Sequence, residues 1–385
     1  MQIIRKNIVI FGAIPPPVTG AAISNELVGE ILIEEYNVFI INTSVGFNKP
    51  KNNPYNFTIY IILTIYKYSE SLLKLAFLLR KNKIHAFYFL PSCNTLGHLK
   101  DSVILLLFGH RLGKIVGHLH NSNFKDLFQT KTYRFLTNKI FNRISLFIFS
   151  SQNLSNECDK YMKADQKTYF NNTINQEIYC SEIELNQKYN LKYELTTFSI
   201  LFVGHMLFSK GCFDLLKSIL LLHESGYQNL SVIFVGGWID AREEKEFNAF
   251  LIDNKMSSYV KCDGIIKDLS VLKQKYLSSD IFALPTYYPY ESQPLSIIDA
   301  MNAGNPIIST DHGTIADFVI SGQNGILVEK HNPEKISEAI IQLLDRNKWL
   351  EFAKQARLDF NENFSYSIYR RNLLKVFKSK SNASK

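Results

Sequence analysis

The chain has 385 residues, 46% of them apolar and 20% charged, with a formal net charge of +8. This composition is typical of a folded globular protein and excludes an intrinsically disordered one. The length is too great for one ordinary hydrophobic core, so we expect two domains, residues 1–180 and residues 181–385.

In the first half, apolar strands alternate with amphipathic helices, which predicts an α/β fold with parallel sheets. No signal-peptide pattern precedes the first strand, and no uncharged apolar run is long enough to span a membrane. The five cysteines are scattered and form no C-x-x-C pair, so we expect reduced thiols and a cytoplasmic protein. The expected strands are 7–12, 37–41, 85–90, 114–119, 145–149 and 167–170, and the expected helices are 20–34, 58–82, 95–111, 132–143 and 151–162.

The excess positive charge lies in the N-terminal half. Residues 1–180 carry 20 Lys and Arg against 11 Asp and Glu, whereas the remaining residues carry 23 against 24. No nucleic-acid recognition module is visible. Basic residues are interleaved with apolar and aromatic ones in 128–143, 59–83 and 105–114. This pattern suits contact with an anionic membrane, and it equally suits core-facing helices with solvated basic faces.

Two loops of the first half contain candidate ligand contacts. The loop after the first strand has three prolines and Gly20, a residue that lets the backbone approach a ligand closely, although it is not a G-x-G-x-x-G motif. The fourth strand ends in His118 and His120, which share one face of the strand. Two histidines at this spacing suit a metal, but no third ligand is near in sequence, so we expect no metal site.

The second half begins after a polar stretch, 171–197, which we interpret as an interdomain linker. Apolar strands then alternate with helices again, so a second parallel sheet is expected. The expected strands are 198–203, 230–235, 259–262, 281–284, 306–309 and 325–328, and the final helices are expected at 333–344 and 347–378.

The segment 285–306 holds the strongest functional pattern. Glu291 precedes a predicted helix and Asp299 lies within it, eight residues or a little over two helical turns later, so we expect both carboxylates to project from one side of the segment. The free N–H groups at the helix N-terminus can bind phosphate. One carboxylate could then contact a sugar and the other a ribose. This predicts a nucleotide-sugar site. The alternative is an amphipathic helix with a favourable N-terminal acid. The expected N-terminal residues are Ser292, Gln293, Pro294 and Leu295.

This segment resembles the signature of the retaining glycosyltransferases of family 4, Glu-Gly-x-Pro-Leu-x-x-x-Glu-Ala-Met-Ala-x-Gly-x-Pro. Ser292 replaces the usual Gly, and Asp299 replaces the second Glu. The resemblance implies the GT-B fold, two Rossmann-like domains facing across a cleft. In it the first domain would bind the acceptor and the second the nucleotide sugar, with the last helix, about 360–378, packing back on the first domain.

The segment 203–211 is similar to the family pattern Val-Gly-Arg-Leu-x-x-x-Lys-Gly, whose Arg and Lys neutralise the donor diphosphate. Gly204 and Lys210 match, but His205 replaces the arginine, and imidazole lacks its bidentate charge. The resemblance further implies that Ile266 contacts the base through its backbone and that His120 reaches the donor sugar. The diphosphate would approach Gly20 and Ala21.

The resemblance therefore implies a retaining transferase that moves a sugar from a nucleotide-diphosphate donor, UDP being favoured. The acceptor would be a saccharide or a polyprenyl-diphosphate-linked saccharide of a surface polysaccharide of O-antigen or capsule type, and no cofactor would be needed. Glu291, His120 and Lys210 are the expected catalytic residues. Two alternatives remain: a sugar-nucleotide epimerase of the same fold, and a catalytically silent subunit that binds a partner enzyme.

Overall fold

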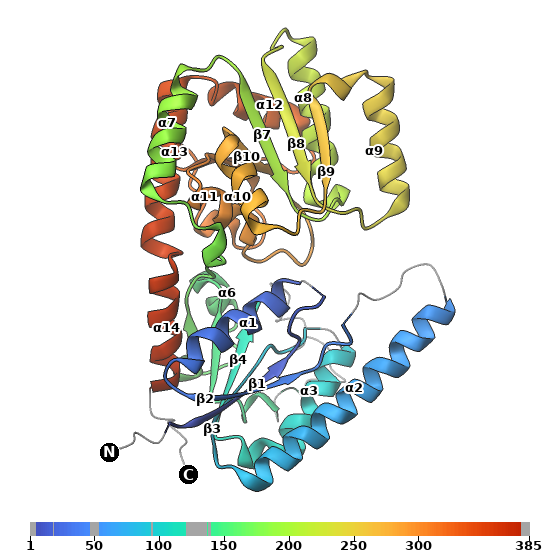
Figure 1. The fold of residues 1–385 in the computed structure, drawn as a ribbon, viewed down its shortest axis with the longest axis vertical. Coiled ribbons are helices and arrows are strands. Elements are labelled where there is room, and N and C mark those ends of the chain that lie inside the picture. The colour runs from blue at the N-terminus through green and yellow to red at the C-terminus, as the bar shows by residue number, and fades with distance from the viewer. Residues whose placement is uncertain are drawn as a thin grey trace. The chain divides into compact units, whose positions relative to one another are not determined.

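The computed structural model describes residues 5–17, 19–46, 54–93, 95–120, 137 and 140–378. Two six-stranded parallel sheets confirm the predicted α/β class (Figure 1). Each sheet is the centre of one compact unit. The first unit comprises residues 1–170 and 370–385, and the second comprises 171–369. The boundary thus lies before the expected position 180, and the end of the chain belongs to the first unit.

The first unit has the strand order β2-β1-β3-β4-β5-β6. Every strand pair is parallel, so the carboxyl ends of its strands share one edge. The strands are β1 (Asn7–Gly12), β2 (Asn37–Asn42), β3 (Ile84–Phe89), β4 (Lys114–Leu119), β5 (Leu146–Phe149) and β6 (Lys167–Tyr169). The helices are α1 (Gly20–Ile33), α2 (Pro54–Lys81), α3 (Thr95–Phe108), α6 (Gln152–Glu157) and the end of α14 (Tyr366–Lys378).

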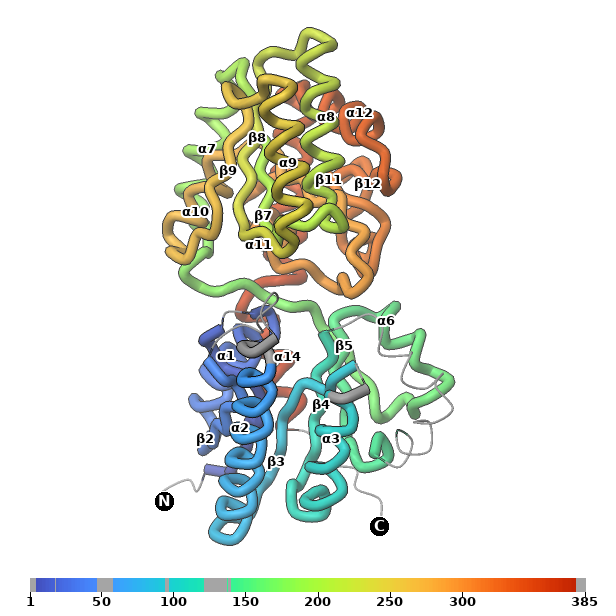
Figure 2. Tube along the Cα trace, turned by 90° about the vertical axis from the view of Figure 1, so that its right-hand side faces the viewer, coloured from blue at the N-terminus to red at the C-terminus, as the bar shows by residue number. Residues whose placement is uncertain are grey.

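Both faces of this sheet are covered, which explains its continuous apolar strands. Val9 and Phe11 point to the face where α2 and α3 pack. Their side chains belong to the same buried apolar cluster as those of the two helices. Figure 2 shows α2 and α3 running side by side on this face. On the other face, Ile10 packs beside α1, and Tyr88 contacts Phe377 of α14 with ring centroids 6.4 Å apart.

The second unit has the strand order β12-β11-β10-β7-β8-β9, again all parallel. Its strands are β7 (Phe198–Val203), β8 (Leu230–Val235), β9 (Val260–Gly264), β10 (Ile281–Leu284), β11 (Ile307–Thr310) and β12 (Gly325–Val328). Its helices are α7 (Glu182–Glu194), α8 (Cys212–Glu224), α9 (Ala241–Asp253), α10 (Leu269–Ser278), α11 (Leu295–Asn302), α12 (Pro333–Gln342), α13 (Arg346–Asn363) and the start of α14.

The expected linker 171–197 is wrong, because it contains helix α7. Ser181 and Glu184 form a capping box at the start of this helix. Two of its inward positions are Lys188 and Lys192, and both are buried. Lys192 pairs with the buried carboxylate of Asp280 at 3.0 Å. Because polar residues occupy core positions, the helix lacks the apolar periodicity by which it would be recognised.

One predicted helix is divided in the structure, and another lies largely outside the described residues. The expected helix 347–378 is two helices, α13 and α14, because α13 ends at Asn363 and α14 begins only at Tyr366. The expected helix 132–143 and the basic run 128–143 lie largely outside the described residues.

Candidate active site

An ion pair lies at the carboxyl edge of the second sheet. The Nζ atom of Lys210 lies 2.5 Å from Oε2 of Glu291, and both side chains are largely buried. The hydroxyl of Thr286 donates to the same carboxylate oxygen at 3.0 Å. The ammonium also lies 4.7 Å from the ring centroid of Tyr288, which adds a cation–π contact. The structure thus brings together two of the three expected catalytic residues.

Lys210 reaches this place because of the turn between β7 and α8. The turn is a short 3-10 segment, Phe208–Lys210, and it ends at Gly211 with φ +82. A Cβ atom at Gly211 would lie 2.3 Å from the carbonyl oxygen of Pro285. Only glycine therefore permits both the left-handed backbone and this close approach. The approach sets Lys210 beside the loop that carries Glu291.

The loop of Glu291 is held from both sides. Its own N–H donates to the carbonyl of Tyr288 at 2.9 Å, which closes a tight turn after β10. The N–H of Tyr287 donates to the carbonyl of Ser209 at 2.8 Å, which ties this loop to the turn of Lys210. Sequence patterns alone predict no role for Thr286 or Tyr288. Their position directly before Glu291, after a buried strand, was the available signal.

The ends of β7 and β8 pack against each other through glycine. A Cβ at Gly236 would lie 1.8 Å from the carbonyl oxygen of Gly204, and Gly236 has φ +152. His205 follows Gly204 and is exposed. Beside these strand ends lies a cavity of about 240 Å³, whose lining includes Met206 and Trp238. Ile266, which follows β9, is half-buried and packs against the core of this unit.

Helix α11 begins later than the sequence suggested. Its first residue is Leu295, and Pro294 is its N-cap. Ser292 and Gln293 therefore precede the helix, and the helical spacing argument does not apply to Glu291. The Gln293 side chain is also engaged: its Oε1 accepts from the N–H of Asn172 at 2.6 Å, and its Nε2 donates to Asn171 at 2.9 Å.

The second carboxylate of the predicted pair lies within α11. Asp299 is half-buried. Burial raises the pKa of its carboxyl to about 7, against a smaller lowering by the nearby Tyr276 hydroxyl. Near neutral pH this carboxyl is therefore partly protonated, so it can donate as well as accept a hydrogen bond.

The first unit positions the third expected catalytic residue. Nε2 of His120 lies 3.0 Å from the hydroxyl of Ser24 on α1, and its ring is tilted by 40° against the ring of His118, with centroids 4.2 Å apart. Burial lowers the pKa of His120 to about 4, so the imidazole is neutral at pH 7. His118 is fully buried, and its Nδ1 is 2.8 Å from the hydroxyl of Tyr88. His120 is thus a neutral hydrogen-bonding group, and the buried ring of His118 packs beside it.

Gly20 and Ala21 form the first turn of α1, one turn before Ser24. Thr19 caps this helix, since its hydroxyl accepts from the N–H of Ala22 at 3.2 Å. Among the residues that the structure describes, none beyond its chain neighbours has an atom within 4 Å of a Cβ built at Gly20. The protein itself therefore does not require glycine here, and the space beside it is open.

No group of three metal-ligating side chains is found in the part of the chain that the structure describes. His118 of β4 and His120, which follows this strand, have different hydrogen-bonding partners: Tyr88 for His118 and Ser24 for His120.

Residues 197–346 match the family model described as glycosyl transferases group 1. An uncharacterised glycosyltransferase of Methanocaldococcus jannaschii is 26% identical over 177 residues, which cover 46% of this chain and 44% of that protein. The chain spans about half, or less, of the length of the curated relatives that it matches.

Solved structures share the fold over nearly the whole chain. Sucrose-phosphate synthase from Thermosynechococcus elongatus superposes with a TM-score of 0.73 at 17% identity, covering 97% of this chain and 98% of that one. The Anabaena protein HepE in complex with UDP and glucose gives 0.70 at 16% identity, covering 96% and 98%. The chain therefore has the two-sheet GT-B fold of these structures, and its residues 197–346 match the model of the glycosyl transferases group 1 family.

Proposed function

We propose that this protein is a retaining glycosyltransferase that takes its sugar from a nucleotide-diphosphate donor, with UDP as the favoured nucleotide. The observation that carries the proposal is the Lys210–Glu291 pair, held at the carboxyl edge of the sheet in a group 1 domain. Ligands of open α/β sheets bind at this edge. The UDP and glucose of HepE, a protein of the same fold, support a UDP-sugar donor.

The proposed reaction breaks the anomeric C–O bond of the donor, and the nucleoside diphosphate leaves with the electron pair. The acceptor hydroxyl oxygen forms the new bond to the anomeric carbon on the same face, and its proton passes to the departing phosphate oxygen. Charge accumulates on that phosphate. The Lys210 ammonium supplies the opposite charge, and the free N–H groups at the start of α11 supply further donors.

Glu291 has two proposed tasks. Its buried carboxylate accepts hydrogen bonds from sugar hydroxyls, which orients the ring, and its hydrogen bond from Lys210 holds that side chain in place before the donor binds. Asp299 is proposed to hold the ribose, and the backbone at Ile266 to meet the base. His120 is neutral, so we propose that it contacts the sugar by hydrogen bonding and does not act as an acid.

We propose that the acceptor is a saccharide or a polyprenyl-diphosphate-linked saccharide of a surface polysaccharide, reached at the cytoplasmic side of the membrane. The five cysteines are all free thiols, which fits that compartment. No metal or cofactor is part of the proposed reaction.

A donor screen tests the proposal. The purified chain is incubated with UDP-, GDP- and dTDP-sugars, and release of nucleoside diphosphate is measured with and without saccharide acceptors. Slow release from one donor, lost in Lys210→Met but kept in Lys354→Met on the exposed side of α13, supports a transferase. Conversion of the donor to an epimer, or failure to bind any nucleotide, would contradict it in favour of an epimerase or a silent subunit.

A further inference from the structure

Helix α2 is apolar on two opposite faces. One face, which includes Ser71, Leu75 and Leu79, is buried on the sheet. The opposite face is solvent-exposed yet apolar, with Leu73 exposed at 72%, Tyr66 at 66% and Phe77 at 60%. Exposed apolar patches of this kind mark interaction surfaces, whereas scattered exposed residues do not.

The exposed apolar residues line one side of α2, where Glu70 stands between Tyr66 and Leu73 and pairs with Lys67 and Lys74. At 100° per residue, positions 59, 62, 66, 73 and 77 fall within one narrow sector of the helix, opposite the buried face. We call this set the α2 stripe: Ile59, Ile62, Tyr66, Leu73 and Phe77, all exposed. The stripe therefore runs along most of a 28-residue helix.

Basic residues border the stripe. Lys74, exposed, lies on its flank, and Lys81 at the end of α2 places its Nζ atom 4.4 Å from the ring of Phe77. Long basic side chains beside apolar ones are typical of helices that lie in a membrane interface, where the charges reach the headgroups.

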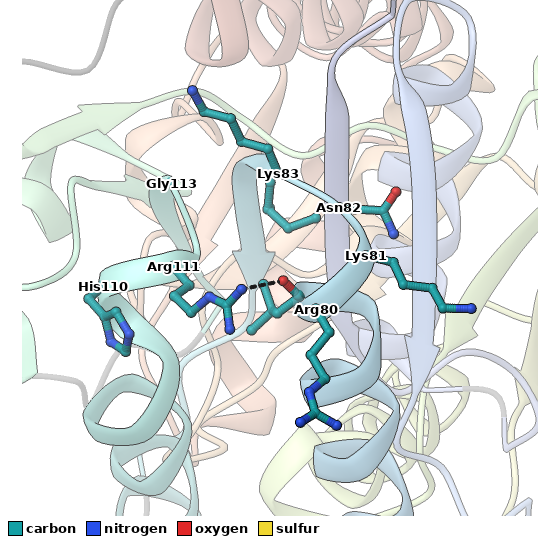
Figure 3. A pocket seen from close by; sticks show the side chains of 9 residues that line it. Arg80, Lys81, Asn82, Lys83, His110, Arg111 and Gly113 are labelled. Carbon is teal, nitrogen blue, oxygen red and sulfur yellow. Dashed lines mark hydrogen bonds between the residues drawn. The ribbon is translucent and has the colours of Figure 1, made fainter.

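A basic cavity continues the stripe at the C-terminal end of α2. It has a volume of about 480 Å³ and lies between the end of α2, the start of β3 and the turn Gly109–Arg111 (Figure 3). Its cationic lining comprises Arg80, Lys81, Lys83 and Arg111. Within the described ranges, none of these four pairs with a carboxylate, and Arg111 donates to the carbonyl of Leu79 at 2.6 Å. The cavity is therefore electropositive and suits a phosphate group.

We propose that the α2 stripe and this basic cavity form a docking face for a membrane that contains anionic phospholipid, with the stripe among the acyl chains and lipid phosphates at the cavity. We infer an anionic membrane because positive charge on the protein attracts anionic headgroups, and the first 180 residues carry 20 basic against 11 acidic side chains. A helix in this position lies on the membrane and does not cross it. Among the described helices, none is both long and apolar enough to span a bilayer.

The inference does not depend on the proposed transferase chemistry, because it rests on residues of the first unit alone. A protein with no enzymatic activity would show the same face. Conversely, donor consumption in solution needs no membrane, so the two proposals fail separately.

Vesicle co-sedimentation of the full chain tests the proposal, with phosphatidylcholine vesicles compared to vesicles that also contain phosphatidylglycerol. We expect binding only to the anionic vesicles, and weaker binding as the salt concentration rises. Leu73→Glu combined with Phe77→Glu should lower binding at least about tenfold. The control Ile183→Glu, at a site on α7 that is also 72% exposed, should bind as the unchanged chain does.

A second variant tests the cavity. Arg80→Gln, Lys81→Gln and Lys83→Gln together should lower binding to anionic vesicles about fivefold for each charge removed, while Arg111 stays to hold Leu79. Nucleoside diphosphate release without vesicles should be unchanged in both variants. Undiminished vesicle binding by the Leu73/Phe77 variant would overturn the proposal. So would a wild-type dimer that becomes monomeric in that variant, because the occupant would then be a second copy of this chain.

Discussion

Lys210 and Glu291 are separated by 81 positions in the chain, yet their charged atoms lie 2.5 Å apart in a largely buried site. Each group compensates the other's desolvation before any ligand binds. A donor diphosphate would offer Lys210 a second anion, so the ammonium can contact both the phosphate and the carboxylate. The pair links the part of the site proposed for the leaving group to the part proposed for the sugar.

Replacing Glu291 tests this link directly. Glu291→Gln keeps the shape but removes the charge, so it leaves Lys210 as an uncompensated buried cation. We expect donor consumption to fall about 100-fold or more. Unfolding free energy should fall as well, by up to about 3 kcal/mol, since one partner of a buried pair is lost. The steady-state rate of nucleoside diphosphate release and a urea unfolding curve measure the two effects.

The exposed Glu334 on α12 provides the control for this variant. Glu334→Gln should leave both the rate and the unfolding curve unchanged. Full activity in Glu291→Gln would show that the carboxylate is not part of the site.

His205 occupies the place where the family pattern has arginine. The side chain is exposed beside the end of β7, so an arginine fits there without repacking the core. We expect His205→Arg to raise the affinity for a nucleoside diphosphate or leave it unchanged, since guanidinium adds a permanent charge and a bidentate donor. Isothermal titration with UDP and GDP measures this affinity. A loss of more than about tenfold would indicate a specific task for the imidazole.

The turn that positions Lys210 depends on Gly211. Gly211→Ala strains a left-handed residue and drives its Cβ into the Pro285 carbonyl, so we expect a loss of about 2 kcal/mol or more in unfolding free energy. Gly226 is the matched control, because it also has positive φ, +93, but no described residue beyond its chain neighbours lies within 4 Å of its Cβ position. Gly226→Ala should lower the unfolding free energy only by the strain of the left-handed backbone. Equal costs for the two variants in thermal or urea unfolding would argue against the close approach at Gly211.

The buried carboxyl of Asp299 should make stability depend on pH. Its pKa is about 7 in the folded chain, above the ordinary value of 3.8, so the unfolded chain loses this proton first as the pH rises. Its contribution to stability is therefore complete below pH 4 and is lost between pH 4 and 7. The side chain of Asp299→Asn stays neutral, so the unfolding free energy of this variant should rise relative to that of the unchanged chain over that range, by at most about 4 kcal/mol. Melting temperatures of both proteins at pH 4 to 8 show the trend, and parallel curves would contradict it.

His120 should give the opposite dependence. Its pKa is about 4 when folded, below the ordinary 6.5, so the unfolded chain takes up the proton first on acidification. The stability it contributes is complete above pH 6.5 and is lost as the pH falls towards 4. His120→Gln should remove this part of the acid sensitivity, while the control His110→Gln at an exposed site should not. The difference in melting temperature between variant and unchanged chain, followed from pH 7 to 4.5, tests the sign.

The sequence alone determined most of the strand positions. All twelve strands of the two sheets lie within two residues of their expected bounds, because parallel strands buried on both faces are short, continuous apolar runs. The segment around Glu291 and the Lys210–Gly211 turn were also recognisable, since their residues are close together in the chain. The helix α7 was not, because buried lysines stand where apolar residues would mark its inner face.

Only the tertiary structure decided the state of the candidate site. It showed that Lys210 and Glu291 are paired, that Gln293 precedes its helix and binds Asn171 and Asn172, and that burial raises the pKa of Asp299. These properties depend on partners and burial contributed by residues far away in the chain. Local sequence patterns specify helices and strands, whereas ionisation and hydrogen bonding follow from the groups that folding brings within a few ångströms.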